Sequence, residues 1–410
     1  MSALLQTLVP ARLGTGFRWL LASSWTTNLG DGIAAAAGPL LVASLTTDPF
    51  LISLAAMTAW APPLICGLWA GVLSDRHNRR TIVLSANAFR AVVLVAMIAA
   101  LAAGRLPVAA ALIGLALIAT AEVFADNTTG TLTPMLVHRD DLAVANARLQ
   151  TGFITLNQLA GPPLGAVLFT VGRAWPLLTE VLLVLAGMVL VSRVSLPPHG
   201  RAVGEAGRSV RHEIIEGCRW VLHHPPVRTL CLTILVFNLA FGAAWSVLVL
   251  YASDHIGLGS IGFGVVTAVS AAGGMLGTAL YGWLTARISL GNLMRIGLII
   301  ETLTHLILAA TTSPWVALPV FFLFGAHAFI WGTTSTTVRQ RAVPEQLQGR
   351  VSAVNTICVF GGLVIGSAAG GLLARQYGLV APFWAAFGAS VVFLALLWPQ
   401  MTRIAHRDQL

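Results

Sequence analysis

The chain contains no lysine, and acidic and basic residues together make up only 10% of its 410 positions. All 24 basic residues are arginine, against 15 acidic residues. Soluble domains carry roughly 25% charged residues, so this composition excludes a soluble protein. The phosphate-binding loop of nucleotide hydrolases ends in Gly-Lys-Ser/Thr. A chain without lysine therefore cannot hold that loop in its standard form, and ATP hydrolysis as an internal energy source is excluded.

Cysteine is also scarce, with four residues too scattered for a disulfide framework. They show neither Cys-x-x-Cys nor Cys/His ligand spacing, and we interpret them as packed thiols. His223 and His224 precede two prolines in a charged segment, where a solvated loop fits better than a metal site. We therefore expect no metal and no cofactor. No Ser/His/Asp constellation lies in a soluble segment either, so an enzyme is not expected.

Apolar sequence is what the chain has in abundance: it is 57% hydrophobic, with a mean hydropathy of +0.83. Stretches near the roughly 20 residues needed to span a bilayer recur twelve times. They cover residues 17–45, 50–73, 81–103, 107–124, 142–171, 175–191, 227–251, 261–284, 293–311, 315–337, 351–374 and 382–397. This pattern predicts an all-α integral membrane protein with twelve transmembrane helices.

A polar interval between Arg193 and Arg228 divides these stretches into two sets of six. Within it, residues 210–222 place apolar side chains on a helical period, which predicts an amphipathic helix at the membrane surface. We expect an N-terminal six-helix bundle at 1–194, a cytoplasmic linker with this helix at 195–224, and a C-terminal six-helix bundle at 225–410.

An internal repeat supports the two halves. The run from Gly161 to Gly165 aligns with the run from Gly366 to Gly370 at a shift of 205 residues. The run GVLSDRHNRR at 71–80 has a counterpart, GWLTARISLGN, at 282–292, in which Ala286 takes the place of Asp75. Six-helix repeats of this kind are typical of secondary transporters, whose substrate site lies between the halves at mid-membrane.

The arginines are distributed unevenly about the apolar stretches. With the N-terminus inside, Arg105, Arg173 and Arg375 fall in outer loops, Arg90 falls within the third stretch, and the other 20 lie at the inner side. This asymmetry follows the positive-inside rule. We therefore expect a multi-pass protein of the cell inner (plasma) membrane with both termini in the cytoplasm. The same uneven distribution of arginine explains the net charge of +9. A nucleic-acid partner is not needed to explain that charge, since no basic face with interleaved aromatic residues exists outside the loops.

The run at 71–80 resembles the loop signature of the major facilitator superfamily of transporters, Gly-x-Leu-Ala-Asp-Arg-x-Gly-Arg-Arg/Lys. The matching residues are Gly71, Leu73, Asp75, Arg76, Arg79 and Arg80. Ser74 replaces the alanine and Asn78 replaces the glycine. The second replacement is a mild change, because asparagine tolerates the left-handed backbone conformation better than most residues.

Three further runs resemble the branch of this superfamily that contains bacterial enterobactin exporters and macrolide-efflux-type proteins. They are NLGDGI at 28–33, EGCRWVLHHPPVR at 216–228 and VRQRAVPEQLQGRVSAVN at 338–355. With the loop signature, the likeness covers essentially the whole chain. It implies the fold and the subfamily but not the cargo, because members of the branch export chemically diverse compounds.

Charges inside apolar stretches select the candidate site. An aspartate at a helix centre costs about 2.5–3.5 kcal/mol, and Asp31 lies near the middle of the first stretch. The resemblance places the first, fourth, seventh and tenth helices around the cavity, so Asp31 is the candidate proton or substrate carboxylate. The alternative is a carboxylate that only forms hydrogen bonds within the bundle. On the tenth stretch, His327 is a second proton or substrate candidate, or else a packed histidine.

Glu122 and Asp126 lie four residues apart on the fourth stretch and share a helix face. We place Asp126 near the inner helix end. There the resemblance implies an inner gate, for which the candidates are Gly71, Asp75, Arg76, Arg79, Arg80 and Asp126. Glu122 fits the gate and the cavity proton site equally well. The resemblance puts the ninth and sixth helices at the periphery, so for Glu180, Glu301 and His305 we favour structural pairing or interfacial placement.

Aromatic and amide side chains on the presumed cavity helices are the candidate cavity lining: Trp25, Asn28, Phe237, Asn238, Trp245 and Trp331.

Small-xxx-small spacing predicts close helix packing at Gly161, Gly165, Gly366, Gly370 and Gly371. Pro162 and Pro163 remove two backbone donors and should kink the fifth helix. Their run, GPPLG, resembles the Gly-Pro-x-x-Gly-Gly element of antiporters, with Ala166 at the last position.

The sequence thus predicts a secondary transporter that exports a small amphipathic molecule, such as a drug, siderophore or secondary metabolite, in exchange for protons. Its expected partners are that substrate, protons and the lipid bilayer, and we expect a monomer that binds no nucleic acid. Two alternatives stay open: an importer on the same fold, and a non-transporting membrane receptor or scaffold.

Overall fold

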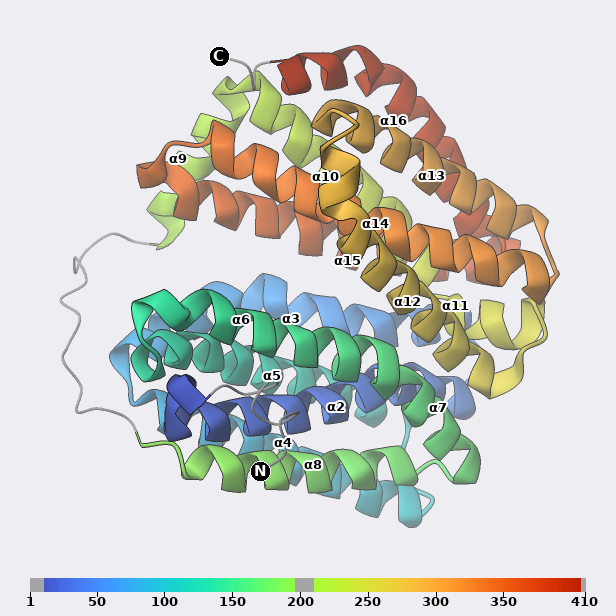
Figure 1. Ribbon diagram of the computed structural model, residues 1–410. Helices are drawn as coiled ribbons and strands as arrows, with labels where there is room; N and C mark the ends of the chain where they lie inside the picture. The colour runs from blue at the N-terminus through green and yellow to red at the C-terminus, as the bar shows by residue number, and fades with distance from the viewer. Residues whose placement is uncertain (1–10, 196–209, 407–410) are drawn as a thin grey trace. The chain divides into compact units, whose positions relative to one another are not determined.

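The structure is a computed structural model that describes residues 11–195 and 210–406. Every regular element in these two ranges is a helix (Figure 1). Twelve of the described helical spans are long and apolar enough to cross a membrane. The predicted all-α membrane fold with twelve spanning helices is therefore confirmed.

The chain divides into two compact units. Unit 1 comprises Met1–Leu45 and Ile65–Ala206, and unit 2 comprises Thr46–Leu64 and Gly207–Leu410. The division falls inside the second spanning helix, α3 (Pro49–Arg76), directly after Pro62 and Pro63. The domain limits 1–194, 195–224 and 225–410 remain a prediction.

In unit 1, α2 lies at the centre and packs against α5, α7 and α8, while α4 packs against α5 and α8. The described elements are η1 (Ala11–Leu13), α2 (Gly14–Leu45), the end of α3, α4 (Arg79–Ala102), α5 (Val108–Leu136), η2 (Arg139–Asp141), α6 (Leu142–Gly152), η3 (Phe153–Ala160), α7 (Gly161–Val171) and α8 (Trp175–Ser192). Because α2 is central, other helices of unit 1 surround the middle of this first span.

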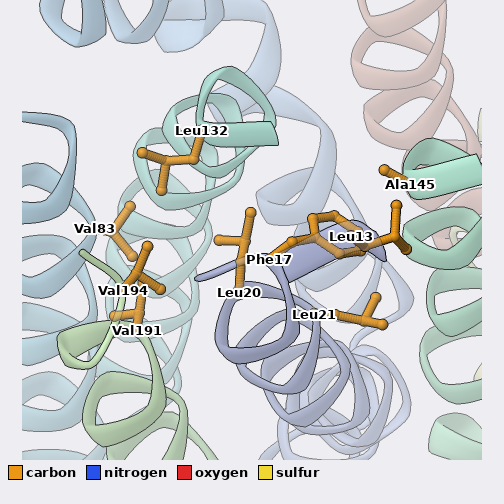
Figure 2. Close-up of a cluster of buried hydrophobic side chains, with 9 residues drawn as sticks. All are labelled: Leu13, Phe17, Leu20, Leu21, Val83, Leu132, Ala145, Val191 and Val194. Atoms are coloured by element: carbon orange, nitrogen blue, oxygen red, sulfur yellow. The ribbon is translucent and has the colours of Figure 1, made fainter. Parts of the chain in front are cut away.

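The start of α2 is held by a compact apolar cluster (Figure 2). Phe17 and Leu20 are fully buried, and they meet side chains from α4, α5, α6 and the end of α8. The cluster comprises Leu13, Phe17, Leu20, Leu21, Val83, Leu132, Ala145, Val191 and Val194. Burial of a large apolar side chain contributes about 1.5–3 kcal/mol, so this cluster anchors the helix that carries Asp31.

The fourth span is longer than its apolar stretch indicates. The stretch ends at residue 124, whereas α5 continues to Leu136. The added part contains several polar residues whose side chains return hydrogen bonds to the helix: Asn127 donates to the carbonyl of Val123, and Thr128 to that of Phe124. The position predicted for Asp126, near the helix end, is therefore wrong, because ten further helical residues follow it.

The fifth span changes its helix type next to its prolines. Between α6 and α7, residues Phe153–Ala160 form a π-helix, and the N–H of Gly161 bonds to the carbonyl of Leu156, five residues earlier. Pro162 and Pro163 lie in the first turn of α7 and provide no N–H groups for α-helical bonds. The irregularity is thus a local π-helix, a form often found at functional sites.

The glycines of unit 1 lie at close helix crossings. A Cβ atom built on Gly161 would lie 2.5 Å from the Cα atom of Gly32, and one built on Gly32 would lie 2.8 Å from the Cα atom of Asn157. Gly165 faces the backbone of Ile33 in the same way. Backbones that approach this closely have no room for side chains, so α2 next to Asp31 packs directly on η3 and α7.

In unit 2, α10 packs against α15 and α16, α13 against α14 and α16, and α12 against α14. The described elements are the start of α3, α9 (Val210–His223), α10 (Pro225–Trp245), α11 (Leu248–Leu250), η4 (Tyr251–His255), α12 (Gly259–Thr285), α13 (Leu290–Ala310), α14 (Pro314–Ala342), η5 (Glu345–Leu347), α15 (Gln348–Tyr377) and α16 (Ala381–His406). At the α10–α15 crossing, Gly366 faces the backbone of Leu239 and Gly370 that of Ala243, while Gly371 faces Ser53 of α3.

Helix α9 lies where the sequence predicts an amphipathic helix, and it packs on the start of α15. Arg350 donates through Nη1 to Glu216 Oε1 at 2.5 Å. Gly217 lies against the backbone of Arg350, and Val221 is buried in an apolar cluster with Val351. An apolar contact and an ion pair thus attach α9 to unit 2.

Asn78, in the signature loop, does not adopt the left-handed conformation. Its φ is −65° and its ψ is 113°, and it forms the N-cap of α4. Its Oδ1 atom accepts hydrogen bonds from the backbone N–H groups of Arg80 and Thr81. The left-handed backbone is therefore not the reason that asparagine is accepted here; Asn78 satisfies free N–H groups of the helix start.

Candidate functional site

Arg90, at the middle of α4, is the centre of a buried charge cluster in unit 1. Its side chain is 1% exposed, and its Nη2 atom donates to Oδ1 of Asp31 on α2. The same nitrogen donates to Oε1 of Glu180 on α8 at 3.2 Å. Both carboxylates are buried. One guanidinium thus connects the first, third and sixth spans.

Small residues make room for this arrangement. Gly30 precedes Asp31, and a Cβ atom built on it would lie 3.4 Å from Leu183 and 3.7 Å from Glu180, both on α8. The backbone of α2 can therefore approach α8 closely enough for Asp31 and Glu180 to share Arg90. Asn87 lies one turn before Arg90, is buried, and accepts a long hydrogen bond of 3.5 Å from Nη1.

Helix α5 adds two more carboxylates to this group. Glu122 interacts electrostatically with Asp31 and Arg90, and so does Asp126. Glu122 is partly buried, whereas Asp126 is exposed. We define the Arg90 cluster as Asp31, Arg90, Glu122, Asp126 and Glu180. It contains four acidic groups and one basic group.

A small polar cavity adjoins the Arg90 cluster. Its volume is about 20 Å³, which is room for about one water molecule. Its lining residues are Ser23, Ser24, Thr27, Val83, Asn87, Arg90, Ala125, Asp126 and Thr129. Asp126 and Arg90 thus border the same polar space, and hydroxyl groups supply hydrogen-bond partners for water within it.

Unit 2 contains a second buried group of ionisable side chains. Glu301 of α13 places Oε2 at 3.2 Å from Nε2 of His327 on α14, and Oε1 at 3.7 Å from Nε2 of His305 on α13. Glu301 is 7% exposed, His305 0% and His327 5%. We define these three residues as the Glu301 cluster. Among the described residues, no group of three or more His, Cys, Asp or Glu side chains is arranged to hold a metal ion.

Aromatic rings surround the two histidines. Trp245 of α10 meets His305 edge to face, with ring centroids 6.2 Å apart, and Phe324 meets His327 in the same way at 5.2 Å. Trp245 also stacks on Phe241 at 4.5 Å. Trp245, a candidate for the cavity lining, therefore lies beside the Glu301 cluster.

The other candidate lining residues have varied surroundings. Trp25 donates from Nε1 to the carbonyl of Arg148 at 3.1 Å. Phe237 lies in an apolar core cluster, and Trp331 packs against it from outside. Asn28 and Asn238 each donate to the carbonyl four residues earlier, at 2.7 Å. The assignment of these five residues to a cavity wall stays a prediction.

The proposed inner gate also stays a prediction. Arg79 donates through Nη1 to the sulfur of Met135 on α5 at 2.8 Å. The side chain of Asp75 lies outside the described part of the structure, as does any contact it makes. Asp126 instead borders the cavity beside Arg90.

The sequence analysis left Arg90 out of the candidate site. The sequence nevertheless marks it, since Arg90 lies near the middle of the apolar stretch 81–103, and an intramembrane charge marks a functional site by default. Glu180 and Glu301 were expected to pair structurally. Their ion pairs are present, but these pairs join them to the same clusters as Asp31 and His327.

Solved structures with the same arrangement of helices are membrane transporters. A variant of the nucleoside transporter NupG matches with a TM-score of 0.76 and 11% sequence identity, covering 95% of this chain and 100% of that one. A bacterial homologue of the iron transporter ferroportin, in its inward-facing state, matches with a TM-score of 0.74 and 18% identity, covering 93% and 98%. The chain therefore has the same fold as these two transporters.

The model of one family, described as transmembrane secretion effector, matches residues 6–409, and the chain belongs to that family. The multidrug efflux pump Tap of Mycolicibacterium fortuitum is 27% identical over 406 residues, covering 93% of this chain and 92% of Tap. Macrolide efflux protein A of Streptococcus pyogenes is 22% identical over 372 residues, covering 88% and 90%. The predicted superfamily and efflux-type branch are therefore confirmed.

Proposed function

We propose that this transporter exports a small amphipathic molecule in exchange for protons, and that the Arg90 cluster binds the exchanged proton. Two efflux proteins among its relatives support the direction of transport. The observation that carries the proton assignment is the pairing of a single buried arginine with Asp31 and Glu180.

The charge balance of the Arg90 cluster favours proton binding. Asp31 and Glu180, both buried, share one guanidinium, so full ionisation leaves one buried negative charge in excess, and the partly buried Glu122 adds to it. An unpaired charge in a low-dielectric interior is very costly. Protons, or a cationic substrate, bring the cluster closer to neutrality, and the cluster therefore has a physical reason to bind them.

The exposure of the carboxylates gives the proton an order of steps. Asp126 is exposed, Glu122 is partly buried, and Asp31 and Glu180 are buried. A proton taken up at Asp126 can pass inward through the polar cavity that Asp126 shares with Arg90. When it neutralises Asp31, the ion pair of Arg90 with Asp31 is lost and the pair with Glu180 remains.

That exchange of partners supplies a two-state element. Asp31 lies on α2 and Glu180 on α8, so a proton on one carboxylate loosens one helix contact and leaves the other in place. In a proton-driven transporter, proton binding must shift the equilibrium between two conformations. A ligand does this only when its affinities for the two conformations differ. We propose Asp31 as the carboxylate whose protonation makes this change.

The remaining parts of the proposal follow from the sequence. We propose a cell inner membrane location with both termini in the cytoplasm, because this orientation satisfies the positive-inside distribution of arginine. We also propose a monomer, a substrate such as a drug, siderophore or secondary metabolite, and His327 as a further proton or substrate residue in unit 2.

The proposal is tested with the purified full-length protein in liposomes under an imposed pH gradient. Ethidium and erythromycin serve as probes, and wild type, Asp31→Asn and Asp140→Asn are compared. Asp140 is a matched control, because its side chain is 90% exposed and outside the Arg90 cluster. We expect gradient-driven flux of a probe with wild type and Asp140→Asn, and its loss with Asp31→Asn.

Each other outcome is informative. Normal gradient-driven transport by Asp31→Asn contradicts the assignment of Asp31. Movement of the probe in the same direction as the protons identifies an importer. Absence of flux with every variant, across a wider panel of siderophores and dyes, favours a receptor or scaffold.

A further inference from the structure

The Arg90 and Glu301 clusters occupy related places in the two sequence repeats. Gly71 and Gly282 begin the two copies of the signature loop and are 211 residues apart, and the same interval separates Arg90 from Glu301. The two residues therefore lie equally far beyond the loop, on the third helix of each half, and both are buried.

The fourth helices repeat the relationship. The interval of 205 residues that aligns Gly161 with Gly366 also separates Glu122 from His327. In unit 1 a base on the third helix interacts with an acid on the fourth. In unit 2 an acid on the third helix meets a base on the fourth. The repeat thus conserves an ionisable pair at this place with the signs exchanged.

The geometry of the Glu301 cluster suits one shared proton. Each carboxylate oxygen of Glu301 faces a different imidazole, at 3.7 Å for His305 and 3.2 Å for His327. None of the four ring nitrogens has a hydrogen-bond partner, so the Nε2 atoms meet Glu301 through ion-pair contacts alone, and both rings are buried. A purely structural pair would be expected to satisfy these buried nitrogens.

Charge counting leads to the same conclusion. With Glu301 ionised and both histidines neutral, the cluster carries one buried negative charge, and one proton makes it neutral. The charged or titratable side chains that interact with Glu301 are His305 and His327. Helix α16, which also packs on α13, has no acidic or basic residue from Ala381 to Gln400, and α10 contributes the ring of Trp245. Within the described part of unit 2, the proton therefore decides the charge of the cluster.

We propose that Glu301, His305 and His327 form a second proton-carrying site, which holds one shared proton and releases and rebinds it during transport. The inference rests on the proposed function, since it assumes a proton-driven cycle. It adds a site in unit 2 to the one in unit 1, and it gives His327 a specific role as the partner of Glu301.

The transport test compares two modes with the same full-length protein in liposomes. One mode is uphill movement of ethidium driven by a pH gradient, and the other is exchange of ethidium at equal pH on both sides. A residue that carries the proton is required only for the first mode. We expect Glu301→Gln and His327→Gln to retain exchange and to lose gradient-driven movement to the level of liposomes without protein.

A histidine outside the cluster provides the control. His255 of unit 2 faces the carbonyl of Thr311 at 3.1 Å, and His255→Gln is expected to retain both modes. Equal loss of the two modes in Glu301→Gln and His327→Gln indicates a structural role and overturns the proposal. Unchanged gradient-driven movement in both variants overturns it as well.

A second measurement does not depend on the variants folding. Nitrogen-15 spectra of histidine in the wild-type protein report ring protonation, and through-space correlations to carbon-13-labelled glutamate carboxyl groups assign the two rings that face Glu301. We expect the two rings together to hold one proton more than two neutral imidazoles do, and ethidium binding to change its distribution. Two rings that stay neutral from about pH 5 to 8 contradict the shared proton.

If wild type itself shows no gradient-driven flux, the proposed function fails and this inference fails with it. If wild type is driven and the variants are unaffected, only this inference fails.

Discussion

Asp31 and Arg90 are 59 residues apart in the chain and form an ion pair inside unit 1. The pair joins the first and third spans at a depth where each charge alone would be strongly unfavourable. Glu180 completes the arrangement through the same nitrogen of Arg90.

Replacement of Arg90 by methionine should destabilise the protein strongly. Asp31 and Glu180 would lose their buried counter-charge, and breaking a buried pair costs about 3–5 kcal/mol. The measurement is thermal unfolding of the purified protein in detergent. The triple change Arg90→Met, Asp31→Asn and Glu180→Gln should recover much of the loss, because it removes the unpaired charges together. Equal stability of the single and triple variants would contradict the buried ion pair.

Arg90→Lys should restore only part of what Arg90→Met loses. A lysine provides a compact charge, whereas the planar guanidinium presents several donors in a fixed geometry. The same thermal unfolding measurement, with gradient-driven ethidium flux as a second readout, places this variant between wild type and Arg90→Met. A fully active Arg90→Lys variant would show that charge alone suffices at this position.

Gly32→Ala should separate α2 from the π-helical segment and lower stability. An added methyl group would meet the backbone of Asn157, and overpacking of this kind costs about 1–3 kcal/mol. Gly130→Ala in α5 is the matched control, because nothing lies within 4 Å of a Cβ atom at that position. Unfolding midpoints of the two variants in detergent are compared, and a tolerated Gly32→Ala would contradict the close crossing.

Substitutions of Asn78 distinguish a helix cap from a left-handed turn. As a cap, Asn78→Ala should cost about 1 kcal/mol and Asn78→Gly only a few tenths. In a left-handed turn, glycine would instead be more favourable than asparagine. Thermal unfolding of the three proteins decides between these outcomes, and a stabilising glycine would refute the cap.

Removal of the Arg350–Glu216 pair should loosen α9 only slightly. The two side chains are 20% and 39% exposed, and exposed pairs contribute about 0.2–1 kcal/mol. Val221→Ala removes buried apolar contact and should loosen α9 more than Glu216→Ala does. Hydrogen exchange of the α9 amides measures both effects, and the opposite order would show that charge rather than burial attaches this helix.

The number and order of the spanning helices were predictable because they depend on local hydrophobicity. Spans such as α4 and α8 are read directly from apolar runs of sufficient length. The extension of α5 to Leu136 was not predictable in this way. The polar side chains of this extension form hydrogen bonds within the helix. A hydropathy scale does not include such bonds, so it places the end of the span too early.

The residue types of the candidate site were visible in the sequence, but their grouping was not. Asp31, Glu122 and His327 were selected because a charge or an imidazole inside an apolar stretch is costly and therefore informative. Arg90 and Glu180 come from spans far from Asp31 in the chain, and no local pattern relates them.

The sequence by itself determined the membrane class, the twelve spans and the repeat, since each follows from composition, hydropathy or spacing along the chain. The tertiary structure alone decided that Arg90 binds Asp31 and Glu180, and that Glu301 lies between two imidazoles. The physical reason is that a buried charge is stabilised by the partners that helix packing brings to it, and these partners are set by contacts between distant segments.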